Sequence, residues 1–202
     1  MDFVFELPNS LSKEKCEEII KLFEEDTRKG PGAVGNPPRT CSIKKSLDLL
    51  ISPHKEWKDL DEYLHVQLAE GIKKYREHLS KLGVGGILDY IFDQGNVIDT
   101  GYQIQKTTMG EYYGWHSDSC VKHHRFLTFL WYLTDHDSLS EGGRTAFHHC
   151  AGDGGKLIVP EQGKLLIFPA TWTYLHSGSV FSPKDDSRIK YICTGWLHSA
   201  EA

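Results

Sequence analysis

The spacing of apolar residues changes about halfway along the chain, and this change restricts the fold more than any other feature. In residues 57–79 an apolar side chain recurs every three or four positions, which predicts a long amphipathic helix of about seven turns. The positions are Trp57, Leu60, Leu64, Leu68, Ile72, Tyr75 and Leu79. Ser52-Pro53 is typical of a helix start and Gly83 of a helix end. Such a helix needs a broad apolar surface to pack against.

A shorter helix is predicted nearer the N-terminus. Ser12 can cap it, and Cys16, Ile19, Ile20 and Phe23 follow at helical spacing. Gly30-Pro31 would stop this helix, and the glycines and prolines of residues 30–42 predict a loop.

The second half carries strand signals instead. Short apolar runs bounded by Gly, Pro, Asp or Ser predict strands at 101–107, 125–133, 144–148, 156–159, 164–168 and 189–197. Residues 126–133 are apolar on both faces, as in a strand that is covered on both sides. Residues 84–100 are expected to be a loop with short strand pieces. Helices followed by short strands favour an α+β fold with a mainly β core, a sandwich or barrel braced by helices.

Composition excludes several classes of protein. The 202 residues suit a single domain, and 23 Lys+Arg against 28 Asp+Glu, with no basic run, argue against a nucleic-acid partner. An apolar stretch approaching the ~20 residues of a membrane helix is missing, and the first residues lack the pattern of a signal peptide. Five scattered cysteines without a CxxC pair predict reduced thiols and a cytoplasmic location.

The chemistry centres on two histidines and one carboxylate. His116 and Asp118 stand two residues apart, so in an extended chain they point to the same side, and His176 follows a buried-strand pattern 58 residues after Asp118. Two imidazoles and a carboxylate form the facial triad that suits Fe(II). A zinc hydrolase can use the same groups, so the ligands alone leave the metal open.

A lysine on an apolar strand face bears on the choice between these two metal sites. Alternation places Lys190, Ile192, Thr194 and Trp196 on one face of the last predicted strand. A lysine between such neighbours is costly to bury unless an anion meets it. A dicarboxylate bound to the metal at its other end would supply that anion. The alternatives are an edge-strand lysine that reaches water, or Arg188 in the same role.

Five segments occur in the order found in one known family. They are Gly110–Asp118, Arg125–Thr134, Glu141–Phe147, Pro169–His176 and Lys190–Trp196. In these segments, within about residues 100–198, the chain resembles the 2-oxoglutarate/Fe(II) dioxygenases, and most of all the prolyl 4-hydroxylase-like branch with its short stand-alone microbial and phage members.

The resemblance implies a double-stranded β-helix, a jelly-roll variant related to the cupins, over residues 84–202, with helical support from residues 1–83. It implies His116, Asp118 and His176 as iron ligands and Lys190 as the partner of the distal carboxylate of 2-oxoglutarate. Tyr132 matches a tyrosine that hydrogen-bonds the same carboxylate, and Thr194 and Trp196 match positions that line the cosubstrate pocket. The cofactors would be Fe(II), 2-oxoglutarate and O₂, with ascorbate as a candidate reductant.

The implied reaction is hydroxylation of an unactivated C–H bond with release of succinate and CO₂. A prolyl or other side chain of a peptide or protein is the expected substrate, with residues 30–42 and 84–100 as the substrate-facing loops. An amino acid or nucleotide hydroxylase and a non-catalytic jelly-roll binding module are the alternatives, and the sequence gives no indication of an oligomeric state. Two departures stand out: Thr107 replaces a common tyrosine, and the interval from His176 to Lys190 is longer than usual.

Overall fold

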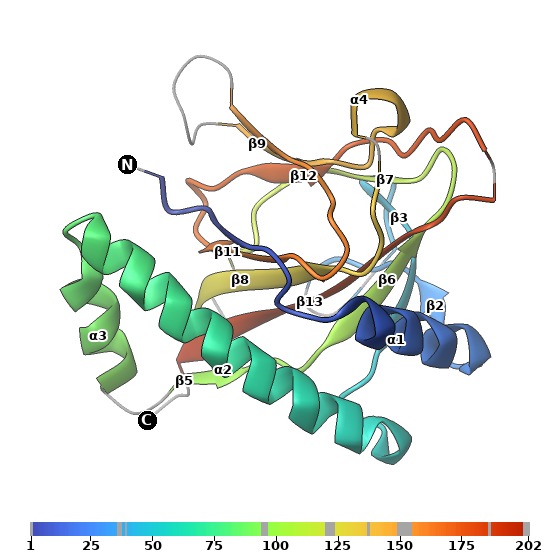
Figure 1. Cartoon of the computed structure of the whole chain (residues 1–202). Helices are drawn as coiled ribbons and strands as arrows, with labels where there is room; N and C mark the ends of the chain where they lie inside the picture. The colour runs from blue at the N-terminus through green and yellow to red at the C-terminus, as the bar shows by residue number, and fades with distance from the viewer. Residues whose placement is uncertain are drawn as a thin grey trace.

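Two antiparallel sheets face each other, and helices cover the outer side of the larger sheet (Figure 1). The computed structural model describes residues 2–35, 38, 40–93, 97–119, 124–136, 138–148, 155–185 and 187–199. In spatial order, the larger sheet consists of β1 (Phe5–Leu7), β11 (Leu165–Pro169), β8 (Arg125–Tyr132), β13 (Lys190–Ser199), β6 (Gln103–Thr107), β4 (Leu47–Leu50) and β2 (Gly30–Pro31), with β5 (Val97–Asp99) also paired to β13. The smaller sheet consists of β10 (Lys156–Ile158), β9 (Thr145–Phe147), β12 (His176–Gly178), β7 (Tyr112–His116) and β3 (Lys44–Lys45).

The path of the chain through these sheets identifies the fold. From β6 to β13 the strands are shared between the sheets, with β6, β8, β11 and β13 in the larger one and β7, β9, β10 and β12 in the smaller one. This winding between two sheets is a double-stranded β-helix, the jelly-roll variant predicted from the sequence. The six predicted strand segments are confirmed as β6, β8, β9, β10, β11 and β13, with ends shifted by at most two residues.

Strand alternation divides the apolar residues between two cores. On β8, Leu127, Phe129 and Trp131 belong to the core beneath the helices. Leu130 and Tyr132 belong instead to a smaller core between the sheets. The prediction that this strand is covered on both sides is therefore confirmed.

The two predicted helices form, and their ends show what the sequence pattern missed. Helix α1 (Lys13–Glu25) is capped by the Ser12 side chain as expected, but it ends at Glu25 rather than at Gly30. All seven predicted apolar positions are buried, six of them on helix α2 (Lys58–Lys81) and Trp57 in the preceding 3₁₀ turn (Lys55–Trp57). Gly83 has φ +77°, which fits the glycine-favoured end of a helix. Among the described residues, no helix is long and apolar enough to span a membrane.

The predicted start of α2 was wrong for a clear reason. Ser52 does not cap the helix; its hydroxyl donates to Asp61 and accepts from the backbone N–H of Tyr102 at 2.9 Å. This serine therefore fastens the turn after β4 to α2 and to β6, and the helix begins six residues later.

Residues 84–100 were predicted correctly only in part. They contain a short strand, β5, as expected, but also the unpredicted helix α3 (Gly85–Asp93), which packs on α2. The segment 30–42, predicted as a loop, begins with the two-residue strand β2, which pairs with β4. Elsewhere, the short helix α4 (Ser138–Glu141) follows β8. A division at residue 83 stays a prediction, although β1–β4 precede that point and already belong to the sheets.

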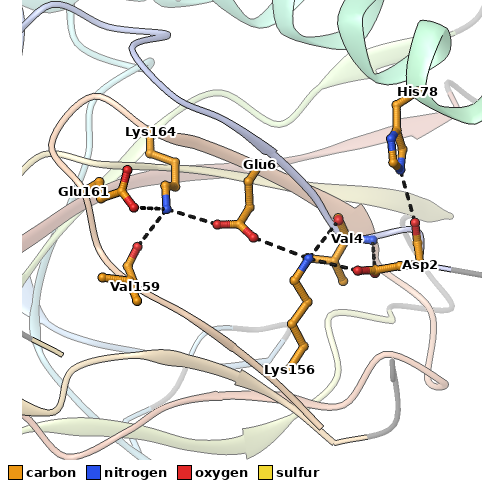
Figure 2. A network of polar contacts seen from close by, with 8 residues as sticks. All are labelled: Asp2, Val4, Glu6, His78, Lys156, Val159, Glu161 and Lys164. Atoms are coloured by element: carbon orange, nitrogen blue, oxygen red, sulfur yellow. Dashed lines mark hydrogen bonds and ion pairs between the residues drawn. The ribbon is translucent and has the colours of Figure 1, made fainter. Parts of the chain in front are cut away.

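The N-terminal segment is fastened along the edge of the larger sheet by a chain of ion pairs (Figure 2). Strand β1 pairs with β11, and Glu6 lies between two lysines. Its carboxylate oxygens are 3.0 Å from Lys164 Nζ and 3.4 Å from Lys156 Nζ. Lys156 also reaches Asp2 at 2.9 Å, and Val4 is buried in the core between the sheets. This segment closes one side of the barrel.

Candidate active site

Two strands of the smaller sheet bring the predicted metal ligands together. His116 is the last residue of β7 and His176 the first of β12, and the two residues are direct partners across the ladder. Asp118 follows two residues after β7 and is buried. One ligand atom from each of His116, Asp118 and His176 lies within 4.8 Å of the others.

Backbone carbonyls orient both imidazoles. His116 Nδ1 lies 2.8 Å from the carbonyl oxygen of Gly114, and His176 Nδ1 lies 3.0 Å from that of Tyr174. A carbonyl only accepts, so we assign the ring proton to Nδ1 in both residues, which leaves the Nε2 lone pairs free. These Nε2 atoms lie 3.8 and 3.4 Å from the carboxylate oxygens of Asp118. Three acceptor groups that face one another in this way fit a divalent cation.

The carboxylate is held ionised and in a fixed orientation. Burial opposes ionisation, but the neighbouring histidines and a hydrogen bond from Thr128 outweigh it, so the pKa of Asp118 lies below its usual range. Thr128 Oγ1 donates to Asp118 Oδ2 at 2.7 Å from β8. The ring of Phe168 packs edge-on against His176, with 4.8 Å between centroids. The sequence analysis did not find Thr128, although its inward position follows from the alternation of β8.

An inner chamber extends from this cluster to Lys190. Lys190 is buried at the start of β13, and its Nζ donates to the carbonyl oxygen of Gly143 at 2.5 Å. Ile192, Thr194 and Trp196 line the same chamber, as alternation predicts. Arg188 lies outside it, where its guanidinium is 3.2 Å from Glu141. The geometry therefore favours Lys190 over Arg188 as the group that faces a ligand.

The other predicted cosubstrate residues differ in how directly they face the chamber. Thr107 lines it as the ladder partner of Lys190. Tyr132 stands behind the wall, where its hydroxyl donates to Thr145 at 2.6 Å, and Thr145 itself lines the chamber. Thr194 donates its hydroxyl proton to the carbonyl of Phe129 at 2.8 Å. The roles of these residues toward a cosubstrate stay predictions.

We call His116, Asp118 and His176 the metal-type cluster. An outer chamber of about 480 Å³ meets the inner one at two of these residues, His116 and Asp118. Six residues border both chambers: Lys44, Gln105, Tyr113, His116, Asp118 and Trp196. The guanidinium of Arg125 lies 3.8 Å from the ring centroid of Trp196 on the outer side. Residues of the 30–42 segment line this chamber, as expected, whereas from 84–100 only Thr100 does so among the residues that the structure describes.

Lys44, Gln105 and Tyr113 also border the site, and the sequence pattern predicted no role for Lys44 or Gln105. The ring of Tyr113 stacks on His116, with centroids 3.5 Å apart and an interplanar angle of 9°. Alternation along β6 could have indicated Gln105. Lys44 carried no such signal, because its strand has two residues and its place depends on pairing with β7.

A double-stranded β-helix with two histidines and one carboxylate at the junction of two chambers is typical of non-haem, metal-dependent oxygenases. Residues 102–198 match the model of the 2OG-Fe(II) oxygenase superfamily. This match confirms the predicted family resemblance, the sheet topology confirms the predicted fold, and the cofactors of this superfamily are Fe(II) and 2-oxoglutarate.

Individual relatives agree with this assignment. A PKHD-type hydroxylase of Synechococcus sp. (strain CC9902) is 31% identical over 98 residues, which are 48% of this chain and 40% of that protein. The match thus spans less than half the length of the curated relative.

Solved structures show the same fold over nearly the whole chain. A prolyl hydroxylase from Trichoplax adhaerens in complex with a peptide fragment of the hypoxia inducible factor oxygen degradation domain has a TM-score of 0.74, with 16% identity, and the match covers 98% of this chain and 84% of that one. The viral collagen prolyl hydroxylase of Paramecium Bursaria Chlorella virus-1, in a 2OG complex, has a TM-score of 0.63, with 19% identity and coverage of 98% and 97%. A prolyl-4-hydroxylase of Pseudomonas putida has a TM-score of 0.67, with 15% identity and coverage of 100% and 95%.

Proposed function

We propose that the chain is an Fe(II)- and 2-oxoglutarate-dependent dioxygenase that hydroxylates an unactivated C–H bond of a peptide or protein side chain, with a prolyl residue as the first candidate. The observation that carries this proposal is that the inner chamber has three metal-type ligands at one end and the buried ammonium group of Lys190 at the other. A metal ion at one end and a cation at the other fit the two ends of a 2-oxo dicarboxylate.

The residues of the chain have separate tasks in this proposal. His116, Asp118 and His176 hold the iron, which with 2-oxoglutarate and O₂ supplies the oxidising chemistry and yields succinate and CO₂. Lys190 binds the distal carboxylate, and the Gly143 carbonyl sets the position of its ammonium group. Apolar chamber residues such as Ile192 and Phe168 exclude water from the bound cosubstrate.

The outer chamber supports a peptide substrate. Its volume is in the usual range of ligand sites, and it meets the inner chamber at the metal-type cluster. Its wall combines apolar residues, including Val34 and Leu50, with the polar groups Gln103 and Arg125. The structural relatives named above include a prolyl hydroxylase with a bound peptide.

Anaerobic optical titration tests the reaction class. Fe(II) plus 2-oxoglutarate should give the wild-type protein a weak visible charge-transfer band, and His176→Ala should abolish this band because it removes one metal ligand. A wild type without the band, or a band that survives in the variant, would contradict the proposal. The first result would favour a non-catalytic module or a zinc site.

Mass spectrometry tests the substrate class. Proline-containing peptides incubated with iron, 2-oxoglutarate and O₂ should gain one oxygen atom, and matched peptides with alanine in place of proline should not. Turnover of free amino acids or nucleotides instead would assign the outer chamber to a small molecule.

The proposed compartment is the cytoplasm, because the described cysteines, Cys16, Cys41 and Cys193, are free thiols. Cys16 and Cys193 are fully buried. Burial raises the pKa of the Cys16 thiol to about 11, so this group has no nucleophilic role at neutral pH.

A further inference from the structure

We propose that Lys44 is a second cationic contact for the cosubstrate, binding the carboxylate at the metal end of the inner chamber while Lys190 binds the distal one. This inference rests on the proposed function, since it takes the inner chamber as the 2-oxoglutarate site. It assigns to β3 a part of the cosubstrate site that no motif in the sequence indicates.

Lys44 lies in the wall of the site rather than at the protein surface. Its side chain is 3% exposed, and its Nζ lies 2.6 Å from Asp48 Oδ2, whose side chain is 6% exposed. The ammonium group is 5.1 Å from the ring centroid of Tyr113, the ring that stacks on His116. Lys44 borders both chambers, as His116 and Asp118 do.

The ladder register gives the level of Asp48, the ion-pair partner of Lys44, along the strands. Lys190 is paired with Thr107, and the next inward residue of β6, Gln105, is paired with both Ile192 and Asp48. Asp48 is therefore one row of residues nearer than Lys190 to the row of Trp196 and Thr128, and Thr128 contacts Asp118. The ion pair with Asp48 holds the Lys44 ammonium at this intermediate level of the chamber.

Asp48 leaves Lys44 able to bind a further anion. An ammonium group has three protons to donate, and one is directed to Asp48 Oδ2. The other carboxylate oxygen, Oδ1, accepts from the Ser46 hydroxyl at 2.8 Å. Asp48 thus positions the lysine, and its own charge is shared with a second donor.

The test must separate anion binding from the simple role of neutralising Asp48. We would measure 2-oxoglutarate affinity by calorimetry without oxygen, with Mn(II) in place of iron, for Lys44→Met, for Asp48→Asn and for the double variant. Lys106→Met is the matched control, because Lys106 is on β6 but pairs with Glu24 on the helix side of the sheet at 2.9 Å.

If Lys44 binds the cosubstrate, the double variant binds 2-oxoglutarate at least about tenfold more weakly than the wild type, as expected for the loss of a charged hydrogen bond. Its Mn(II) affinity without 2-oxoglutarate, and the 2-oxoglutarate affinity of Lys106→Met, should stay at the wild-type value. Asp48→Asn keeps the ammonium group and should bind 2-oxoglutarate as tightly as the wild type or more tightly.

A double variant with wild-type affinity would overturn the inference, since Lys44 would then only neutralise Asp48. If the methionine variants fail to fold, Lys44→Gln combined with Asp48→Asn is measured in their place, and wild-type affinity in that pair would equally overturn the inference. Asp48→Asn alone is the control for loss of the carboxylate. A wild-type protein that binds no 2-oxoglutarate would instead overturn the proposed function itself.

Discussion

The protonation state of Lys190 should control how tightly the protein holds an anionic cosubstrate. Burial lowers the pKa of Lys190 to about 8. A bound dianion favours the protonated form, so binding is strong while the free protein carries the charge and weakens as the pH rises through this pKa. We expect 2-oxoglutarate affinity to be constant near pH 7 and to fall about tenfold per pH unit well above pH 8, measured by calorimetry with Mn(II).

Lys190→Arg provides the control for this pH dependence. A guanidinium stays charged throughout the range, so affinity in this variant should be independent of pH between 7 and 9, whatever its absolute value. Equal slopes for the wild type and the variant would show that another group titrates.

At the residue scale, the sequence predicts which side chains share a strand face, because side chains alternate along a strand. This alternation placed Lys190 and Trp196 on one face, and in the structure both line the inner chamber. His116, Asp118 and His176 were found from their spacing and their flanking strands. Lys44 escaped because its position depends on which distant strand lies beside it, and a single sequence does not contain that pairing.

The long helix α2 offers a direct test at the scale of one element. Leu64 is fully buried on its inner face, whereas Val66, two residues away, is 57% exposed. Leu64→Ala should lower the free energy of unfolding by about 3 kcal/mol, because it leaves a cavity against the larger sheet. Val66→Ala should change it by less than about 0.5 kcal/mol. Urea denaturation measures both, and similar effects would mean that α2 does not pack as described.

Element length explains which parts of the fold the sequence revealed. Helix α2 is 24 residues long, so its period repeats enough times to be recognised. Strand β8 has eight residues, which is also long enough for its pattern to be recognised. Strands β2 and β3 have two residues each, too few for a period of two to show. Helix α3 begins with two glycines, which oppose a helix assignment; its packing on α2 supplies stabilisation that local propensity does not.

The N-terminal segment links the stability of the whole molecule to a few ion pairs and to the apolar contacts of Phe3, Val4, Phe5 and Leu7. Removing residues 1–7 would uncover the edge of β11 and the core around Val4. We expect a lower unfolding midpoint in urea and a tendency to associate through the exposed edge, detectable by size-exclusion chromatography. Glu6→Gln, which keeps the strand, should remain monodisperse if the wild type is; association of this variant as well would contradict the edge-strand explanation.

The position of β13 has a consequence for how the protein is made. This strand, the last one described, lies in the middle of the larger sheet, between β8 and β6. Until the ribosome has released it, β1, β11 and β8 cannot join β6, β4 and β2, and Lys190 has no chamber to face. Completing the larger sheet therefore requires β13 to insert between β8 and β6, a step dominated by contacts distant in sequence. A nascent chain that ends before residue 176 carries His116 and Asp118 but lacks His176, so it cannot complete the metal-type cluster.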